Sequence, residues 1–130
     1  MDFLNNFFRS VRGNEWDYVN IINQSGCSSL VGRQGGKQDI SLSSIGCLSR
    51  STIKHEIFHS LGYYHEQSRQ DRDNFVKINF ANVHSSHKHN FDWKQNTETF
   101  GVPYDGRSIM HYGYKYFSKN GSPTIEAKVL

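Results

Sequence analysis

The stretch HEIFHSLGYYHE, residues 55–66, constrains this chain more than any other part of its sequence. It places three histidines and two glutamates within twelve positions, with Gly62 between the second and third histidine. An α-helix advances by about 100° per residue, so His55 and His59 project from the same face, one turn apart. Two neutral imidazoles at this spacing can share one Zn²⁺ ion. The stretch therefore predicts a helix that carries two metal ligands.

Residues 50–61, RSTIKHEIFHSL, have the pattern of an amphipathic helix around these two histidines. Ser51 or Thr52 can cap its start, and Gly62 can end it in a left-handed conformation. The face opposite the histidines carries an apolar stripe, formed by Ile53, Ile57 and Leu61. We expect this stripe to hold the helix against the core, with the histidines on the other side.

A hydrolytic zinc site needs a third protein ligand, an open position for water and a neighbouring base. His65 follows His59 by six residues, and a continuing helix would carry it away from the metal. Gly62 allows a sharp turn at positive φ that returns His65 to the metal. Glu56 follows His55 directly and can reach a water on the metal. The spacing thus predicts three ligands and a general base.

Two other interpretations compete with a catalytic site. HExxH alone also occurs on solvated helix faces, but the longer string HExxHxxGxxH fixes two further positions and is far more specific. A structural zinc site is usually closed by a fourth Cys or His. The nearest further histidines, His84, His87 and His89, have the irregular spacing typical of a solvated loop. The pattern therefore favours an open site.

The composition is that of one folded domain. The chain has 130 residues, and its nine Phe and seven Tyr need an interior. The formal net charge is +3, but Lys and Arg are scattered and form no basic stripe among aromatic residues, which argues against nucleic-acid binding. No apolar run approaches the roughly 20 residues of a membrane-spanning helix.

Short strands and turns are predicted on both sides of the helix, which indicates an α+β fold. Residues 15–23 mix aromatic and β-branched residues and predict a strand. Residues 39–46, DISLSSIG, alternate apolar residues with serines and predict a short half-exposed strand, expected at a sheet edge. Asn120-Gly121 predicts a tight turn.

The chain has two cysteines, Cys27 and Cys47, which are twenty positions apart and belong to no CxxC unit. This number excludes a four-cysteine zinc site. The two residues can be free buried thiols or one disulfide, of which the disulfide is favoured. Closing a loop of this size contributes roughly 3 kcal/mol on the chain-entropy model.

Residues 55–73, HEIFHSLGYYHEQSRQDRD, resemble the signature of the astacin family of zinc endopeptidases, within the metzincins. Five further segments resemble the family in the same order: GCSSLVG, ISLSSIGCLSRSTIKHE, VKINFANV, HNFDW and VPYDGRSIMHYGYKYFSKNGSPTI. The resemblance covers roughly residues 9–126. It implies a metzincin-type zincin fold of the α+β class, with a small mixed β-sheet, an active-site zinc helix and an irregular C-terminal part.

The resemblance implies a zinc-dependent endopeptidase that hydrolyses peptide bonds in proteins through a zinc-bound water. Glu56 would be its general base and acid. The ligands of its one zinc ion per chain would be His55, His59 and His65.

Further roles follow from the same resemblance. Met110 would be the Met-turn residue beneath the metal site. Tyr112 would bind zinc at rest and swing away to stabilise the oxyanion. Cys27 and Cys47 would form a disulfide of the family, and an edge strand at Asp39–Ser43 would align a protein or peptide substrate in extended form.

The sequence also departs from the family pattern. Residues 1–130 are expected to be a single astacin-like peptidase domain without the N-terminal and C-terminal portions of the usual domain. A second disulfide of the family is missing, and Phe7 or a neighbour stands where its early cysteine is expected. Glu66 would normally meet a matured N-terminus. The alternative function is therefore a truncated, inactive astacin-like module that binds zinc.

The family is secreted, so the resemblance implies an extracellular location. The start of the chain, MDFLNNFFRSVRG, does not have the layout of a secretory signal peptide, because polar residues interrupt its apolar ones. Two glycosylation sequons, Asn23-Gln24-Ser25 and Asn120-Gly121-Ser122, gain meaning only in a secreted chain.

Overall fold

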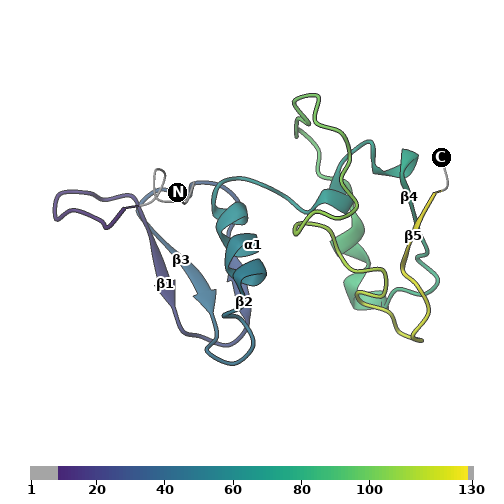
Figure 1. The fold of residues 1–130 in the computed structure, drawn as a ribbon, viewed down its shortest axis with the longest axis horizontal. Coiled ribbons are helices and arrows are strands. Elements are labelled where there is room, and N and C mark those ends of the chain that lie inside the picture. Colours follow the sequence, from purple (N-terminus) through teal and green to yellow (C-terminus); the bar gives the residue numbers. More distant parts are fainter. Residues whose placement is uncertain (1–8, 129–130) are drawn as a thin grey trace. The chain divides into compact units, whose positions relative to one another are not determined.

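The computed structural model describes residues 9–128, which fall into two compact units. The first unit ends at Gly62 and holds a small sheet and an α-helix, while the second begins at Tyr63 and consists of short strands and tight helical turns (Figure 1). The predicted α+β class is confirmed. Phe7, where the family resemblance expects an early cysteine, lies outside the described residues.

Within the described part of the first unit, the sheet has three strands and is mixed. Its strands are β1 (Tyr18–Ile22), β2 (Cys27–Ser29) and β3 (Lys37–Leu42). They lie in the order β1-β3-β2, with β3 parallel to β1 and antiparallel to β2. Strand β1 confirms the strand predicted within residues 15–23.

The prediction that Asp39–Ser43 forms an edge strand is wrong. Strand β3 is the central strand, and β1 and β2 cover its two sides. The serines of this segment suggested a solvated face, but Ser41 is only 7% exposed and its hydroxyl donates to the Gly26 carbonyl at 3.3 Å. A hydrogen-bonded serine can occupy a central strand, so its polarity did not indicate the strand's place in the sheet.

The helix α1 (Arg50–Ser60) lies where the sequence predicts it, with two differences at its ends. Its cap is Ser49, whose hydroxyl oxygen accepts the backbone N–H of Thr52 at 3.1 Å, and not Ser51 or Thr52. Leu61, predicted as part of the apolar stripe, is 53% exposed because the helix ends one residue before it.

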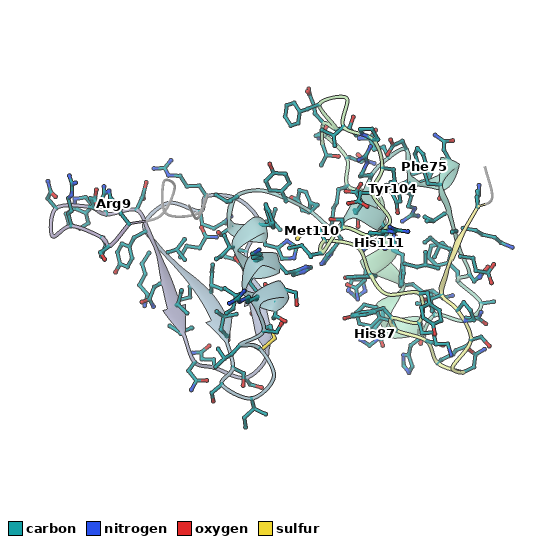
Figure 2. All side chains as sticks on the ribbon, viewed as in Figure 1. Arg9, Phe75, His87, Tyr104, Met110 and His111 are labelled. Atoms are coloured by element: carbon teal, nitrogen blue, oxygen red, sulfur yellow. A yellow bond between two sulfur atoms is a disulfide. The ribbon has the colours of Figure 1, made fainter. Side chains whose placement is uncertain are left out.

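The core of the first unit forms where α1 and the sheet pack together. Its buried residues are Ile40, Leu42 and Cys47, and Ile53 and Ile57 of α1 pack against them. A disulfide joins Cys47 to Cys27 in β2, and it appears as a yellow bond in Figure 2. The bond connects the edge strand to the segment that leads into α1.

The second unit is largely irregular, as the family resemblance predicts. Strands β4 (Val76–Ile78) and β5 (Ile125–Ala127) pair antiparallel. Three short 3₁₀ helices accompany them: Glu66–Ser68, Arg72–Asn74 and Ser85–Phe91. The core of this unit consists of Val76, Val83, Phe91 and Ile125.

We predict that the Cys27→Ser/Cys47→Ser double variant loses roughly 3 kcal/mol of unfolding free energy, because its unfolded chain is no longer constrained by the bond. Denaturant unfolding followed by circular dichroism measures this loss. Adding reductant to the wild-type protein should give the same midpoint as the double variant, and reductant should not affect the variant. Equal midpoints for wild type and variant without reductant would contradict the prediction.

Candidate metal centre

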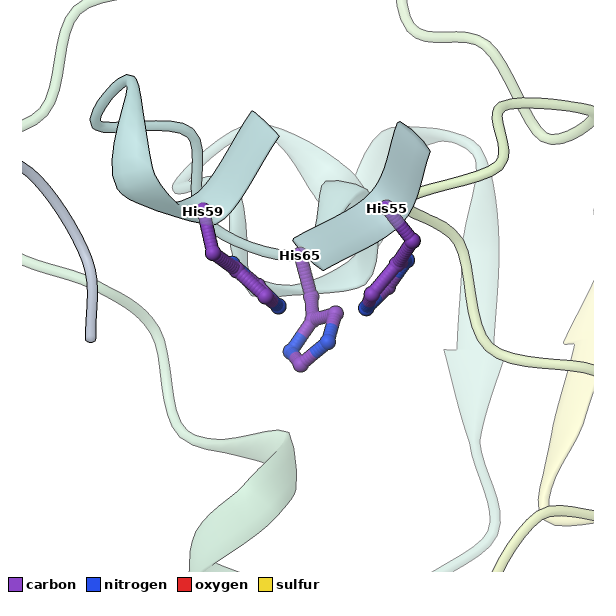
Figure 3. A group of neighbouring side chains, drawn as sticks. All are labelled: His55, His59 and His65. Carbon is purple, nitrogen blue, oxygen red and sulfur yellow. The ribbon is translucent and has the colours of Figure 1, made fainter. Parts of the chain in front are cut away.

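Three histidine side chains, those of His55, His59 and His65, form a group that can hold a metal ion. Each offers one ring nitrogen, and these nitrogens all lie within 4.8 Å of one another. Figure 3 shows the three rings on the same side of the chain, with those of His55 and His59 projecting from α1. The structure thus brings together the three residues that the sequence predicts as ligands.

The helix and the turn after it account for this arrangement. His55 and His59 are one helical turn apart, and their ring centroids are 4.6 Å apart. Gly62 has a φ of +104°, as the motif predicts. The carbonyl of His59 accepts the N–H of Gly62 at 2.9 Å and that of Gly32 at 2.8 Å. These two bonds end the helix at a fixed point, from which the chain turns toward His65.

The donor set fits a zinc ion with an open coordination position. Imidazole nitrogens are good zinc ligands, and two of them on one ion can be no more than about 4.2 Å apart, twice a Zn–N bond. The three ring nitrogens, which lie within 4.8 Å of one another, are close to this limit. Among the described residues, no cysteine or carboxylate joins the three histidines in this group. Three protein ligands are typical of catalytic zinc sites, whereas structural sites usually have four.

Glu56 lies beside the first ligand on α1 and is buried, with 5% of its surface exposed. Burial raises the pKa of its carboxyl group above the usual value, and His55 opposes that rise. A carboxylate is costly to bury unless something compensates it, so its position on the polar face of the helix calls for a functional reason.

Tyr112 and Met110 lie in the second unit, close to the segment that contains His65. The rings of Tyr112 and His65 have centroids 4.5 Å apart. Burial raises the pKa of the Tyr112 hydroxyl. The carbonyl of Met110, whose side chain is buried, accepts the backbone N–H of Glu66 at 2.9 Å. Figure 2 labels Met110.

Gln67 and His111 are site residues that sequence reasoning missed. The side-chain oxygen of Gln67 accepts the backbone N–H of Tyr112 at 3.0 Å. The ring nitrogen Nδ1 of His111 lies 2.7 Å from the carbonyl oxygen of Tyr112. Neither residue belongs to a spacing pattern, and the partner of Gln67 is 45 positions away, so no local signal could have identified it.

Glu66 has partners within its own unit. Its Oε1 accepts the guanidinium of Arg69 at 2.9 Å and the backbone N–H of Asp105 at 2.9 Å. Arg69 also donates to the carbonyls of Val102 and Pro103. These bonds attach the segment after His65 to the loop that precedes the Met110 region.

The histidines at 84, 87 and 89 are not part of the three-histidine group. The ring nitrogens Nδ1 of His84 and His87 both lie within 2.9 Å of the Ser86 hydroxyl. His84 and His89 are exposed, and all three histidines lie in or directly before the turn Ser85–Phe91. The exposure of His84 and His89 agrees with the expectation, whereas His87 is half-buried and stacks on the ring of Phe117, with centroids 4.6 Å apart.

Fold and site together are of the metzincin type, with a helix that carries two of the three grouped histidines and ends at a glycine turn. The chain matches the model of the Astacin peptidase family over residues 6–130, and it belongs to that family. The prediction of zinc as the cofactor is confirmed. Relatives of the chain are zinc proteinases, and the three-histidine group is present.

Curated relatives and a solved structure agree with this assignment. The chain is 50% identical over 112 residues to zinc metalloproteinase nas-13 of Caenorhabditis elegans, covering 85% of this chain and 25% of that protein. It is 46% identical over 114 residues to the low choriolytic enzyme of Oryzias latipes, covering 88% of this chain and 42% of that protein. The structure of high choriolytic enzyme 1, a hatching enzyme zinc-protease from Oryzias latipes, matches with a TM-score of 0.84 at 41% identity, covering 89% of this chain and 58% of that one.

The chain therefore spans less than half the length of these two curated relatives. Within residues 9–128, no helix has both the length and the apolar character that crossing a membrane requires.

We predict that Gly62→Ala weakens zinc binding, because a β-carbon at a φ of +104° is strained and the turn toward His65 must relax. The added carbon meets only ordinary contact, 4.0 Å from the Gly32 Cα, so backbone strain and not a clash is tested. Zinc affinity from competition with a chromophoric chelator measures the effect, expected to be about tenfold.

Gly121→Ala is the matched control, since Gly121 also has a positive φ, of +78°, but lies outside the metal group. Both variants should lose stability, and only Gly62→Ala should lose zinc affinity. Equal zinc affinities in the two variants would show that the turn does not place His65.

Proposed function

We propose that this chain is the catalytic part of a zinc-dependent endopeptidase that cleaves peptide bonds in proteins. The observation that carries the proposal is the three-histidine group with no fourth Cys or carboxylate ligand among the described residues, next to the buried carboxyl group of Glu56. Membership of the astacin family supports it. In this proposal the zinc ligands are His55, His59 and His65.

When bound, zinc supplies a Lewis acid that polarises the scissile carbonyl and lowers the pKa of a water molecule. Glu56 takes the proton from the attacking water and passes it to the leaving amine, since one carboxyl group can act as base and then as acid. Its place directly after His55 on a rigid helix fixes where this proton is held.

Tyr112 is proposed to donate its hydroxyl hydrogen to the oxyanion that develops on the carbonyl. Its ring contact with His65 supports this role. A phenol with an ordinary pKa of about 10 is protonated at neutral pH and can donate. Met110 is proposed as the Met-turn residue, and its carbonyl bond to the Glu66 N–H supports a place close to the ligand segment.

The substrate is proposed to be a protein or peptide bound in extended form along β2. Among residues 9–128 this strand has a neighbour on one side only, so its other side can pair with an added strand. The chain that continues from β2 reaches Gly32, whose N–H binds the carbonyl of His59. The free edge of β2 thus leads directly to the metal helix.

We predict that Glu56→Gln reduces peptide cleavage by about 10²–10⁴-fold, because the amide cannot accept the proton. The variant should still bind one zinc ion per chain, as measured by elemental analysis. Cleavage of an unfolded protein substrate, with and without chelator, measures the activity. Glu98→Gln, at an exposed position, is the matched control and should cleave like wild type.

Chelator-resistant cleavage, or full activity in Glu56→Gln, would contradict the proposed mechanism. A wild-type chain that unfolds cooperatively and binds one zinc ion but cleaves nothing would instead support the inactive zinc-binding module.

We also propose that the protein is secreted. The Cys27–Cys47 disulfide supports this location, since disulfides persist in oxidising compartments. Of the two sequons, Asn23 has the freer amide: it is exposed, and its Nδ2 has one long contact of 3.5 Å to Ser44. The Nδ2 of Asn120 donates to Asn82 at 3.0 Å.

We therefore predict glycosylation at Asn23 when the chain is expressed in a secreting eukaryotic host. Mass spectrometry of the intact protein should show a glycan mass that disappears in Asn23→Gln and remains in Asn120→Gln. A glycan mass that persists in Asn23→Gln, or a secreted wild-type chain with the unmodified mass, would refute the assignment.

A further inference from the structure

Two bonds attach the Met110–Tyr112 segment to the segment that contains His65. The N–H of Glu66 donates to the carbonyl of Met110 at 2.9 Å, and the N–H of Tyr112 donates to the Oε1 of Gln67 at 3.0 Å. From this geometry we propose that Gln67 is a positioning residue, which fixes the backbone of Tyr112 beside His65. The inference rests on the function proposed above for Tyr112.

Gln67 is placed as a dedicated acceptor. It is fully buried, and its Nε2 is a buried side-chain atom without a hydrogen-bond partner among the described residues. Its orientation is fixed, because the N–H of Tyr112 can only donate and must therefore face the amide oxygen. Burying an unpartnered amide donor is unfavourable, and a methionine of similar size would avoid it. The amide at this position is therefore explained by the acceptor that it provides to Tyr112.

A buried arginine holds Gln67 in place. Arg72, 4% exposed, donates from Nη1 to the carbonyl of Gln67 at 2.9 Å and also to the carbonyl of Phe91. The ring of Phe91 is fully buried and meets the ring of Tyr112 edge-on, with centroids 5.7 Å apart. Charge-assisted bonds from a guanidinium are strong. Arg72 therefore holds the backbone of Gln67, which provides the acceptor for Tyr112, and the backbone of Phe91, whose ring contacts Tyr112.

The other backbone group of Tyr112 is also held by a side chain. Its carbonyl oxygen lies 2.7 Å from Nδ1 of His111, and Nε2 of that ring lies 2.6 Å from the Tyr104 hydroxyl. Since a carbonyl only accepts, Nδ1 carries a hydrogen and donates it to the carbonyl of Tyr112. With both backbone groups held, the Cα–Cβ bond of Tyr112, about which its side chain rotates, has a fixed direction. Loss of the Gln67 acceptor releases the backbone N–H of Tyr112, one of the two groups that hold this bond.

The test compares three substitutions of Gln67 with a matched control. Gln67→Met removes the acceptor at similar volume, and Gln67→Asn withdraws it by one methylene. Gln67→Glu keeps an oxygen acceptor whether or not it is protonated. The control is Gln70→Met, the same exchange at an exposed position of the same segment.

The first measurement is hydrogen exchange of the Tyr112 amide, by NMR in the metal-free protein. We expect exchange about tenfold faster in Gln67→Met and Gln67→Asn, and close to wild type in Gln67→Glu and Gln70→Met. The amide of Lys77, which lies opposite Glu126 in the β4–β5 ladder, should exchange at the wild-type rate in all four variants. The second measurement is peptide cleavage by the zinc-loaded protein, in which kcat should fall about tenfold with KM unchanged in the first two variants only.

Unchanged Tyr112 exchange in both removing variants would overturn the proposal. So would equally accelerated exchange at Lys77, or a kcat loss in Gln67→Met that Gln67→Glu does not restore, since both indicate a purely structural role. If Gln67→Met fails to fold, the comparison of Gln67→Asn with Gln67→Glu decides the same question. A wild-type chain without cleavage would contradict the proposed function, while the exchange measurement still tests the placement of Tyr112.

Discussion

The turn at Gly62 is the constraint on which the metal group depends. Its positive φ ends α1 directly after the second ligand, and the carbonyl of His59 accepts two backbone N–H groups there, from Gly62 and Gly32. One acceptor thus joins the end of the helix to the chain that continues from β2. Backbone hydrogen bonds within the first unit thus fix where the helix ends, five residues before His65.

The helix α1 combines two requirements that conflict energetically. Ile53 and Ile57 pack on the core, but Glu56, His59 and Ser60 are buried as well, and buried polar groups stabilise a fold only when they are satisfied. A helix optimised for stability would not bury a carboxyl group beside two imidazoles. The Cys27–Cys47 disulfide lies in the same small core and offsets part of this cost by restricting the unfolded chain.

The sequence predicted what depends on neighbours along the chain. The helix, the shared face of His55 and His59 and the turn at Gly62 all follow from local periodicity and from the freedom of glycine. The place of β3 in the sheet was wrong because strand order is set by pairing partners far away in the sequence. Gln67 was missed for the same reason, since its burial and its partner depend on how the second unit folds.

In the second unit, side chains hold backbone groups that regular structure would otherwise pair. Buried N–H and carbonyl groups need partners, and few strands are present here to provide them. Gln67 accepts from Tyr112, Arg72 donates to two carbonyls, and the buried Thr124 hydroxyl lies within hydrogen-bond distance of the carbonyls of Tyr114 and Tyr116. Polar side chains other than the proposed metal ligands thus hold the backbone of Tyr112 and of the two tyrosines at 114 and 116. In a unit of this kind we expect the loss of one buried side-chain acceptor to free a backbone segment, whereas a long helix that loses one bond has many others to hold it.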